Sequence, residues 1–180
     1  MIKILKQTSK KSYMNLMDKF NKLSRSEFIS TFGNIFEKTE WIAEKCYDSK
    51  PYSNFNELVS RMLEVYERAE KNKHLEILNS HPDLAVEKKL TDDSKNEQKN
   101  ANLNECTNEE FIEFKKLNEE YKKKFGFPFI IAVKGKKKEE ILNSFRQRIT
   151  NNINSEFEEA KKQVKKIASL RLSEITKQII

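Results

Sequence analysis

The stretch TNEEFIEFKKLNEEYKKKFGFPFIIAV, residues 107–133, predicts the two kinds of backbone expected in this protein. Thr107 and Glu110 have the spacing of a capping box, which marks the start of a helix. An apolar stripe at helical spacing follows, at Phe111, Phe114, Leu117 and Tyr121. Gly126 is placed to end this helix. The apolar run 127–133 has the length and β-branched content of a strand or a buried extended segment.

The rest of the chain predicts further helices and no second extended run. Only 3 Gly and 3 Pro occur in 180 residues, and Lys and Glu are abundant, which favours helices over a many-stranded sheet. Apolar spacing and capping residues predict helices over residues 24–36, 41–47, 53–69, 75–80, 141–149 and 157–175. A further helix is predicted to begin at Thr91. We therefore expect an all-α fold: a single-domain helical bundle over residues 1–180, with one short extended apolar segment near the functional site.

The composition narrows the classes of partner. The net charge is +7, but 28 acidic residues are interspersed among 35 basic ones, and lysine outnumbers arginine. This pattern is more typical of a solvated surface than of a nucleic-acid interface, so no nucleic-acid partner is expected. No apolar run reaches membrane-spanning length, and Cys46 and Cys106 lack metal-site or disulfide-framework spacing. We expect a cytoplasmic protein with two reduced thiols and no membrane partner.

His81 is the first candidate for chemistry. It follows an apolar helix and precedes Pro82, and proline disfavours helical geometry at the residue before it. His81 should therefore lie at a helix end, where its imidazole either caps that helix or transfers protons near neutral pH. The other histidine, His74, lies among Lys71, Asn72 and Lys73 and is expected to be exposed.

Arg171 is the second candidate. In the last helix it lies on or beside the apolar stripe of Val164, Ala168 and Ile175. A buried guanidinium needs an anionic partner. That partner is either a carboxylate of the protein or an anionic ligand held by two hydrogen bonds.

Ser94 and Glu97 also allow two interpretations. Their spacing is that of a capping box, so their role could be to cap the start of a helix. If Thr91 is the N-cap instead, Ser94 and Glu97 lie on one helical face and are available to a pocket. No cluster of metal ligands, phosphate-binding glycine loop or nucleophile motif is present in the sequence. We expect no metal and no cofactor, so any chemistry would rely on proton transfer and electrostatics.

Several blocks of the sequence, in order, resemble one enzyme family. The block HPDLA at residues 81–85 resembles the signature of the 2-oxo-4-hydroxy-4-carboxy-5-ureidoimidazoline (OHCU) decarboxylases. SKNEQ at 94–98 resembles the S-x-x-E-Q segment of the family. KFGFPFI at 124–130 resembles the block of the same sequence in the family. IASLRL at 167–172 is similar to the C-terminal block, and residues 36–43 are similar to the family's E-x-S-P-W-I-A segment, with Glu40 in place of proline.

The resemblance implies a helical carbon–carbon lyase that needs no cofactor. Such an enzyme would decarboxylate OHCU to (S)-allantoin in urate degradation, because the electron pair left behind can enter the adjacent C=N bond of the ring. By this resemblance His81 is the acid/base and Glu97 its polar partner. The implied substrate-binding residues are Pro82, Ser94, Lys95, Asn96, Gln98, the backbone of Phe129, Ile130, Ile131, Ala132 and Val133, and Arg171. Relatives also suggest a homodimer.

Two stretches depart from the family pattern. The chain between Ala85 and Thr91 is shorter than the Gly/Ala-rich stretch of relatives. The usual AGAGL after the S-x-x-E-Q segment is KNANL at residues 99–103. The alternative function is a helical binding or scaffold protein that keeps the fold without the activity. A scaffold would have no reason to retain His81, Glu97 and Arg171 together.

Overall fold

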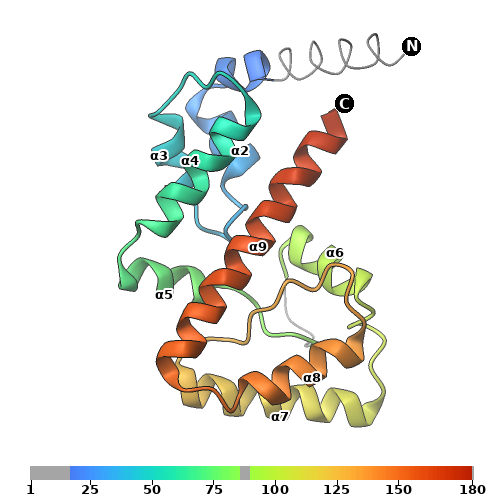
Figure 1. The fold of residues 1–180 in the computed structure, drawn as a ribbon. Coiled ribbons are helices and arrows are strands. Elements are labelled where there is room, and N and C mark those ends of the chain that lie inside the picture. Colours follow the sequence, from blue (N-terminus) through green and yellow to red (C-terminus); the bar gives the residue numbers. More distant parts are fainter. Residues whose placement is uncertain (1–16, 86–89, 180) are drawn as a thin grey trace, which may run out of the picture. The chain divides into compact units, whose positions relative to one another are not determined.

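The computed structural model describes residues 17–85 and 90–179, without the side chains of 177–179, and all regular secondary structure in this part is helical (Figure 1). Residues 17–22 are helical. The helices that follow them are α2 (Arg25–Phe32), α3 (Trp41–Tyr47), α4 (Phe55–Glu67), α5 (Lys71–Ser80), α6 (Asp92–Asn100), α7 (Asn108–Phe125), α8 (Lys138–Arg148) and α9 (Ile153–Ile179). The predicted all-α class is therefore confirmed.

The chain forms two compact units. Of the described residues, those within 71–167 form the central unit, and those before it together with those from Ala168 onward form the terminal unit. The unit boundary falls within the continuous helix α9. The single domain over residues 1–180 stays a prediction.

In the terminal unit, α2, α3 and α4 pack through aromatic and aliphatic side chains. Ser24 caps α2 in the predicted capping box with Glu27. The helix ends at Phe32, earlier than the stripe predicted, and residues 33–36 form turns. Phe36 is nevertheless buried and stacks on Tyr66 of α4, with ring centroids 5.0 Å apart. The stripe thus identified core residues correctly but not the end of the helix.

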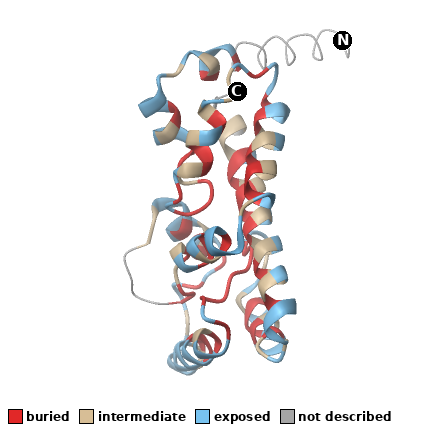
Figure 2. Ribbon diagram, turned by 90° about the vertical axis from the view of Figure 1, so that its left-hand side faces the viewer, coloured by how far each residue is buried: buried red, intermediate tan, exposed pale blue. Residues whose placement is uncertain are grey.

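In the central unit, the core gathers around Tyr121 of α7. Four phenylalanine rings lie with their centroids 4.5–6.0 Å from the Tyr121 ring: Phe125, Phe127, Phe129 and Phe145. Residues 127–133, called the apolar segment below, are buried throughout (Figure 2) and lie outside any helix or strand. The interpretation as a buried extended segment is thus correct, and the strand interpretation is wrong, because this segment pairs with no other strand in the described residues.

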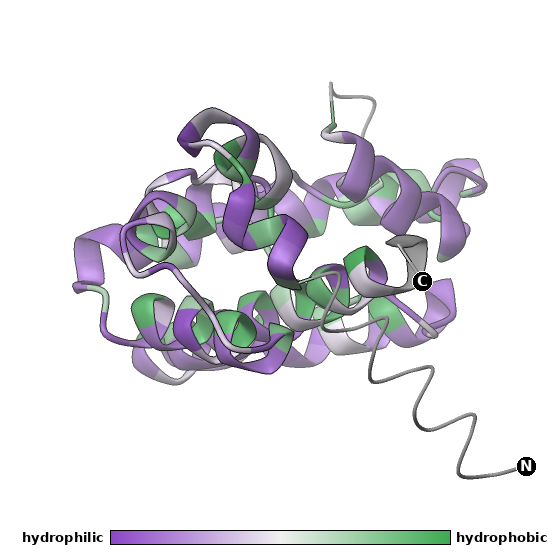
Figure 3. Ribbon diagram, turned by 90° about the horizontal axis from the view of Figure 1, so that it is seen from above, coloured by the Kyte–Doolittle hydropathy of each residue, from purple (hydrophilic) through white to green (hydrophobic). Residues whose placement is uncertain are grey.

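The expected exposure of His74 is wrong. His74 is 2% exposed, because it shares the buried face of α5 with Ile77 and Leu78, and its ring packs edge-on against Phe157. Phe111, the first residue of the apolar stripe of α7, is 39% exposed. The helices carry hydrophobic and hydrophilic residues on different faces (Figure 3). None of the described helices combines the length and hydrophobicity needed to cross a bilayer.

Gly126 ends α7 as predicted, and this generates a test. Its φ of +79° is left-handed, and a Cβ added there would meet no atom within 4 Å. Gly126→Ala should therefore lower the free energy of unfolding by about 1–2 kcal/mol through backbone strain alone. Urea denaturation followed by circular dichroism measures this loss. Gly126→Asn is the matched control and should lose less, because asparagine tolerates this conformation; equal stability of all three proteins would contradict a left-handed C-cap.

Candidate functional site

A pocket with a cavity volume of about 30 Å³ lies within the central unit. This volume is smaller than the roughly 300–1,000 Å³ of typical small-molecule sites. Its lining comes from the residues that follow α5, from α6, from the apolar segment and from α9. The lining residues are His81, Pro82, Leu84, Ser94, Glu97, Gln98, Phe129, Ile130, Ile131, Val133 and Ile167.

His81 lies at the end of α5, as the following proline predicted. The helix stops at Ser80, and the His81 N–H donates to the Leu78 carbonyl at 3.2 Å. The imidazole is 8% exposed, and its Nδ1 lies 2.8 Å from the carbonyl oxygen of Ile77. Because a carbonyl oxygen only accepts, Nδ1 carries a hydrogen in this contact. His81 therefore both caps α5 and lines the pocket, so its two interpretations are compatible.

The N-cap of α6 decides how Ser94 and Glu97 are used. Thr91 is the cap, and its hydroxyl accepts the Ser94 N–H at 3.3 Å. Ser94 and Glu97 then lie three residues apart on the face of α6 that lines the pocket. The capping-box interpretation of these two residues is therefore wrong.

Lys95 and Asn96 are exposed and do not line the pocket. Both lie between Ser94 and Glu97 in sequence, and the helical period turns them away from the face that Ser94 and Glu97 share. The structure therefore does not bring these two expected substrate-binding residues to the site.

Gln98 connects α6 to residues 81–85, called the histidine loop below. Its amide nitrogen donates to the Asp83 carbonyl at 3.2 Å, and its amide oxygen accepts the Ala85 N–H at 3.1 Å. Asn118 of α7 donates to the Leu84 carbonyl at 2.9 Å, and Lys122 forms an ion pair with the Asp83 carboxylate at 2.8 Å. The histidine loop is thus held by side chains from two helices.

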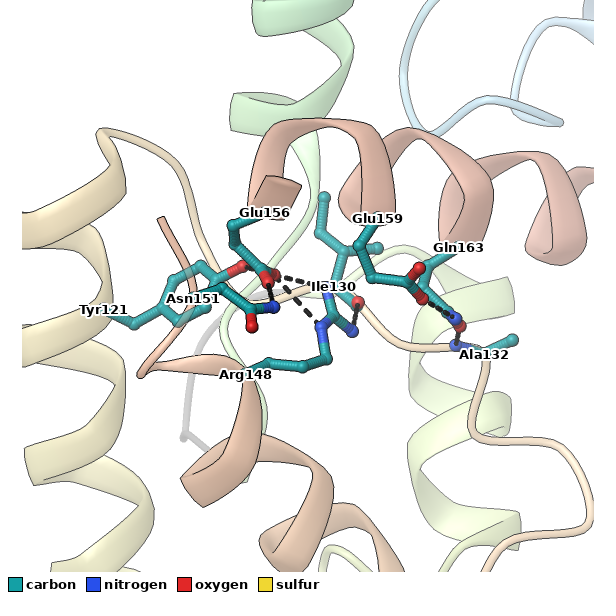
Figure 4. Close-up of polar contacts among 8 residues, drawn as sticks. All are labelled: Tyr121, Ile130, Ala132, Arg148, Asn151, Glu156, Glu159 and Gln163. Atoms are coloured by element: carbon teal, nitrogen blue, oxygen red, sulfur yellow. Dashed lines mark hydrogen bonds and ion pairs between the residues drawn. The ribbon is translucent and has the colours of Figure 1, made fainter. Parts of the chain in front are cut away.

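The apolar segment contributes four of its five expected residues to the pocket. Phe129, Ile130, Ile131 and Val133 line it, whereas Ala132 does not. The Ala132 N–H instead donates to the side-chain oxygen of Gln163 in α9 at 3.0 Å (Figure 4). The one expected residue that does not line the pocket thus has its main-chain N–H in a contact with α9.

Arg171 belongs to the terminal unit. It is 6% exposed, its Nη2 lies 2.9 Å from the buried Glu37 carboxylate, and its Nη1 donates to the Asn34 carbonyl at 2.9 Å. Of the two partners that the sequence allowed, the structure contains the protein carboxylate. The expected contact of Arg171 with a ligand stays a prediction.

Two lining residues were not expected from the sequence. Leu84 belongs to the HPDLA block, which could have indicated it. Ile167 lies in the apolar stripe of α9, where nothing in the spacing separates a pocket residue from a core residue. In the described part of the chain, no group of three or more His, Cys, Asp or Glu side chains is arranged to hold a metal ion.

The first departure from the family pattern precedes α6, and the second begins in its last turn. Residues 86–89, within the shortened stretch after Ala85, lie outside the described residues. In the second stretch, Asn102 stands where the family motif has its last glycine, and its φ is +56°. Asparagine is among the non-glycine residues that most readily adopt this left-handed conformation. The glycine-poor sequence thus still allows a left-handed residue here, and Leu103 is buried.

Comparisons with known proteins agree with these features. The family model described as OHCU decarboxylase matches residues 21–173. A uric acid degradation bifunctional protein of Bacillus sp. (strain TB-90) is 44% identical over 162 residues, which are 90% of this chain and 32% of that protein. The chain thus spans about a third of the length of this relative, and the same holds for its Bacillus subtilis counterpart, PucL, at 33%.

A shorter relative and a solved structure match over most of this chain. The OHCU decarboxylase of Haloferax volcanii is 37% identical over 158 residues, covering 88% of this chain and 94% of that protein. A crystal structure of (S)-allantoin synthase superposes with a TM-score of 0.69 at 27% identity, covering 88% of this chain and 52% of that one.

The two hydrogen bonds of Gln98 to the histidine loop generate a stability test. Gln98→Leu should lower the free energy of unfolding by about 1–3 kcal/mol, because it leaves a buried N–H and a buried carbonyl without their partner. Urea denaturation measures this loss. Lys99→Leu, at the exposed neighbouring position, is the matched control and should change stability little. Equal effects of the two substitutions would contradict the role of Gln98.

Proposed function

This chain belongs to the OHCU decarboxylase family, and we propose that it decarboxylates OHCU to (S)-allantoin and CO2 in urate degradation. The observation that carries the proposal is the pocket in which His81 and Glu97 are both lining residues. A family-typical histidine and carboxylate, brought to one small cavity from different elements, support an acid/base site.

His81 is the proposed proton-transfer residue, and its contact with Ile77 selects the reactive atom. Because the Nδ1 hydrogen is directed at the Ile77 carbonyl, Nε2 is the ring atom that exchanges a proton with the substrate. Neutral His81 then presents a lone pair at Nε2, and protonated His81 presents a second N–H there. The same atom thus serves as base or as acid without a rotation of the ring.

The proposed reaction breaks one carbon–carbon bond and takes up one proton in total. The bond between the ring carbon and the substrate carboxylate breaks, CO2 leaves, and the electron pair enters the adjacent C=N bond, whose nitrogen takes up a proton. The hydroxyl of the resulting enol then loses its proton and becomes a carbonyl, while a proton relayed through Nε2 of His81 goes to one face of the neighbouring ring carbon and gives a single enantiomer. Glu97 would favour the protonated imidazole by its negative charge. No external electron sink is required, because the ring itself accepts the pair.

The other expected residues would bind and orient the substrate. The Ser94 hydroxyl, the main chain of Pro82 and main-chain groups of residues 129–133 would hydrogen-bond the substrate, and all of these residues except Ala132 line the pocket. Gln98 has one amide hydrogen and one oxygen lone pair beyond its contacts with the histidine loop. Arg171 is the proposed cation for the substrate, although it is paired with Glu37 in the terminal unit. A homodimer remains part of the proposal, and analytical ultracentrifugation would test it.

The first functional prediction concerns His81. His81→Asn should lower kcat by about 10²–10⁴-fold, the usual contribution of general acid–base catalysis. The asparagine amide can still donate to the Ile77 carbonyl, so the helical circular dichroism should persist. The assay supplies freshly generated OHCU and records the circular dichroism of the allantoin formed. Production of (S)-allantoin at the wild-type rate by this variant would reject His81 as the proton-transfer residue.

The second functional prediction separates the two faces of α6. Ser94→Ala should raise KM by about threefold to tenfold, the equivalent of one neutral hydrogen bond. Lys95→Ala, one residue away on the exposed face, is the matched control and should leave KM unchanged. Initial rates over a range of OHCU concentrations measure both. The reverse pattern would place the substrate on the other side of α6.

A further inference from the structure

Two side chains outside the pocket hold the main chain of the apolar segment (Figure 4). Arg148, at the end of α8, donates from Nη1 to the Ile130 carbonyl at 2.8 Å. Gln163 of α9 accepts the Ala132 N–H at 3.0 Å. The two contacts are made two residues apart on the segment that lines the pocket.

The Arg148 contact belongs to a buried network. Its Nε and Nη2 donate to Oε1 of the fully buried Glu156 at 3.0 and 2.6 Å. Asn151 donates to the other carboxylate oxygen at 2.7 Å, and the Tyr121 hydroxyl donates to Oε1. Burial, with the neighbouring carboxylate, raises the pKa of Tyr121, which keeps this hydroxyl a donor. The Arg148 guanidinium also lies 4.5 Å from the centroid of the Phe129 ring.

The Gln163 contact is oriented by a second residue of the same helix. The Gln163 amide nitrogen donates to the Glu159 carboxylate at 2.7 Å, one helical turn earlier. This bond fixes which end of the amide faces the apolar segment. Because the amide nitrogen points at Glu159, the amide oxygen points at the Ala132 N–H and can accept its hydrogen bond. Glu159 thus sets the orientation in which Gln163 can accept.

The spacing of the two contacts determines what faces the pocket. In an extended backbone, the N–H and carbonyl of one residue point to the same side, and those of the next residue point to the opposite side. Ile130 and Ala132 use groups on the side of Arg148 and Gln163. The N–H and carbonyl of Ile131 are then turned away from these two side chains, and Ile131 lines the pocket.

We propose that Gln163 is a positioning residue: by holding Ala132, it keeps the donor and acceptor of Ile131 directed at the edge of the substrate ring. Arg148, paired with Glu156, fixes the main chain at Ile130. Gln163 fixes the direction in which the main-chain groups after Ile130 point, which is called the register of the segment below. The proposal rests on the proposed function for the identity of the ligand, a flat heterocycle with amide-like groups on its edge. Its structural part concerns only the register of the segment.

The main test replaces Gln163 by leucine, which has a similar size but cannot accept a hydrogen bond. Gln163 is partly buried on the surface of α9, so Gln163→Leu should fold, and circular dichroism checks this. Hydrogen–deuterium exchange of a peptide covering residues 128–134 should accelerate about threefold to tenfold, reflecting one lost hydrogen bond. KM for OHCU should rise by a similar factor, while the pH dependence of kcat, which reports on His81, should stay the same.

Two further variants serve as controls. In the double variant Glu159→Gln/Gln163→Glu, the amide and the carboxylate exchange places, so an oxygen at position 163 can still accept the Ala132 N–H. This variant should restore both slow exchange and the wild-type KM. Lys162→Leu, at an exposed neighbouring position of α9, should change neither quantity.

The outcomes distinguish this inference from the proposed function. If the wild-type protein does not turn over OHCU but Gln163→Leu still accelerates exchange in residues 128–134, the proposed function fails and the structural role of Gln163 holds. If the wild-type protein is active and Gln163→Leu changes neither exchange nor KM, the positioning role is overturned and the decarboxylase proposal stands. Accelerated exchange with an unchanged KM would also overturn it, because the register would then not matter to the substrate.

Discussion

The structure depends on satisfying the main-chain hydrogen bonds of a buried segment that is not helical. A helix pairs its own N–H and carbonyl groups, but residues 127–133 have neither a helical ladder nor a neighbouring strand in the described residues. Buried main-chain groups without partners are destabilising, so side chains must replace the ladder. Arg148 and Gln163 do so for Ile130 and Ala132. The buried charge of Arg148 is in turn neutralised by Glu156.

The histidine loop is held according to the same principle. Gln98 and Asn118 donate to its carbonyl groups, and Gln98 also accepts the Ala85 N–H. The pocket is lined by residues of both non-helical stretches. This arrangement has a chemical reason, because a helix presents only side chains to a ligand, whereas non-helical backbone can present its own donors and acceptors. Helices thus supply the supports, and the two non-helical stretches supply much of the pocket lining.

Local signals in the sequence predicted local structure well. The capping boxes at Ser24 and Thr107 and the left-handed Gly126 depend only on residues a few positions apart, and each occurs as predicted. Exposure was less predictable. The lysines beside His74 suggested a solvated ring, but a helix buries one face whatever the residues on the other face are. Phe111 begins an apolar stripe, yet it is 39% exposed, because spacing cannot tell how far the covering elements extend.

The sequence by itself determined the helical class, the position of His81 at a helix end and the family to which the chain belongs. These follow from short-range spacing and from ordered blocks of sequence. Only the tertiary structure decided that Thr91, not Ser94, caps α6, that Gln98 supports the histidine loop, and that Arg171 pairs with Glu37. The capping choice depends on which face of α6 is buried, and the other partners lie at separations that no helical or strand period specifies. Packing alone brings such residues together, and it thereby selects one hydrogen-bonding arrangement from several that the sequence permits.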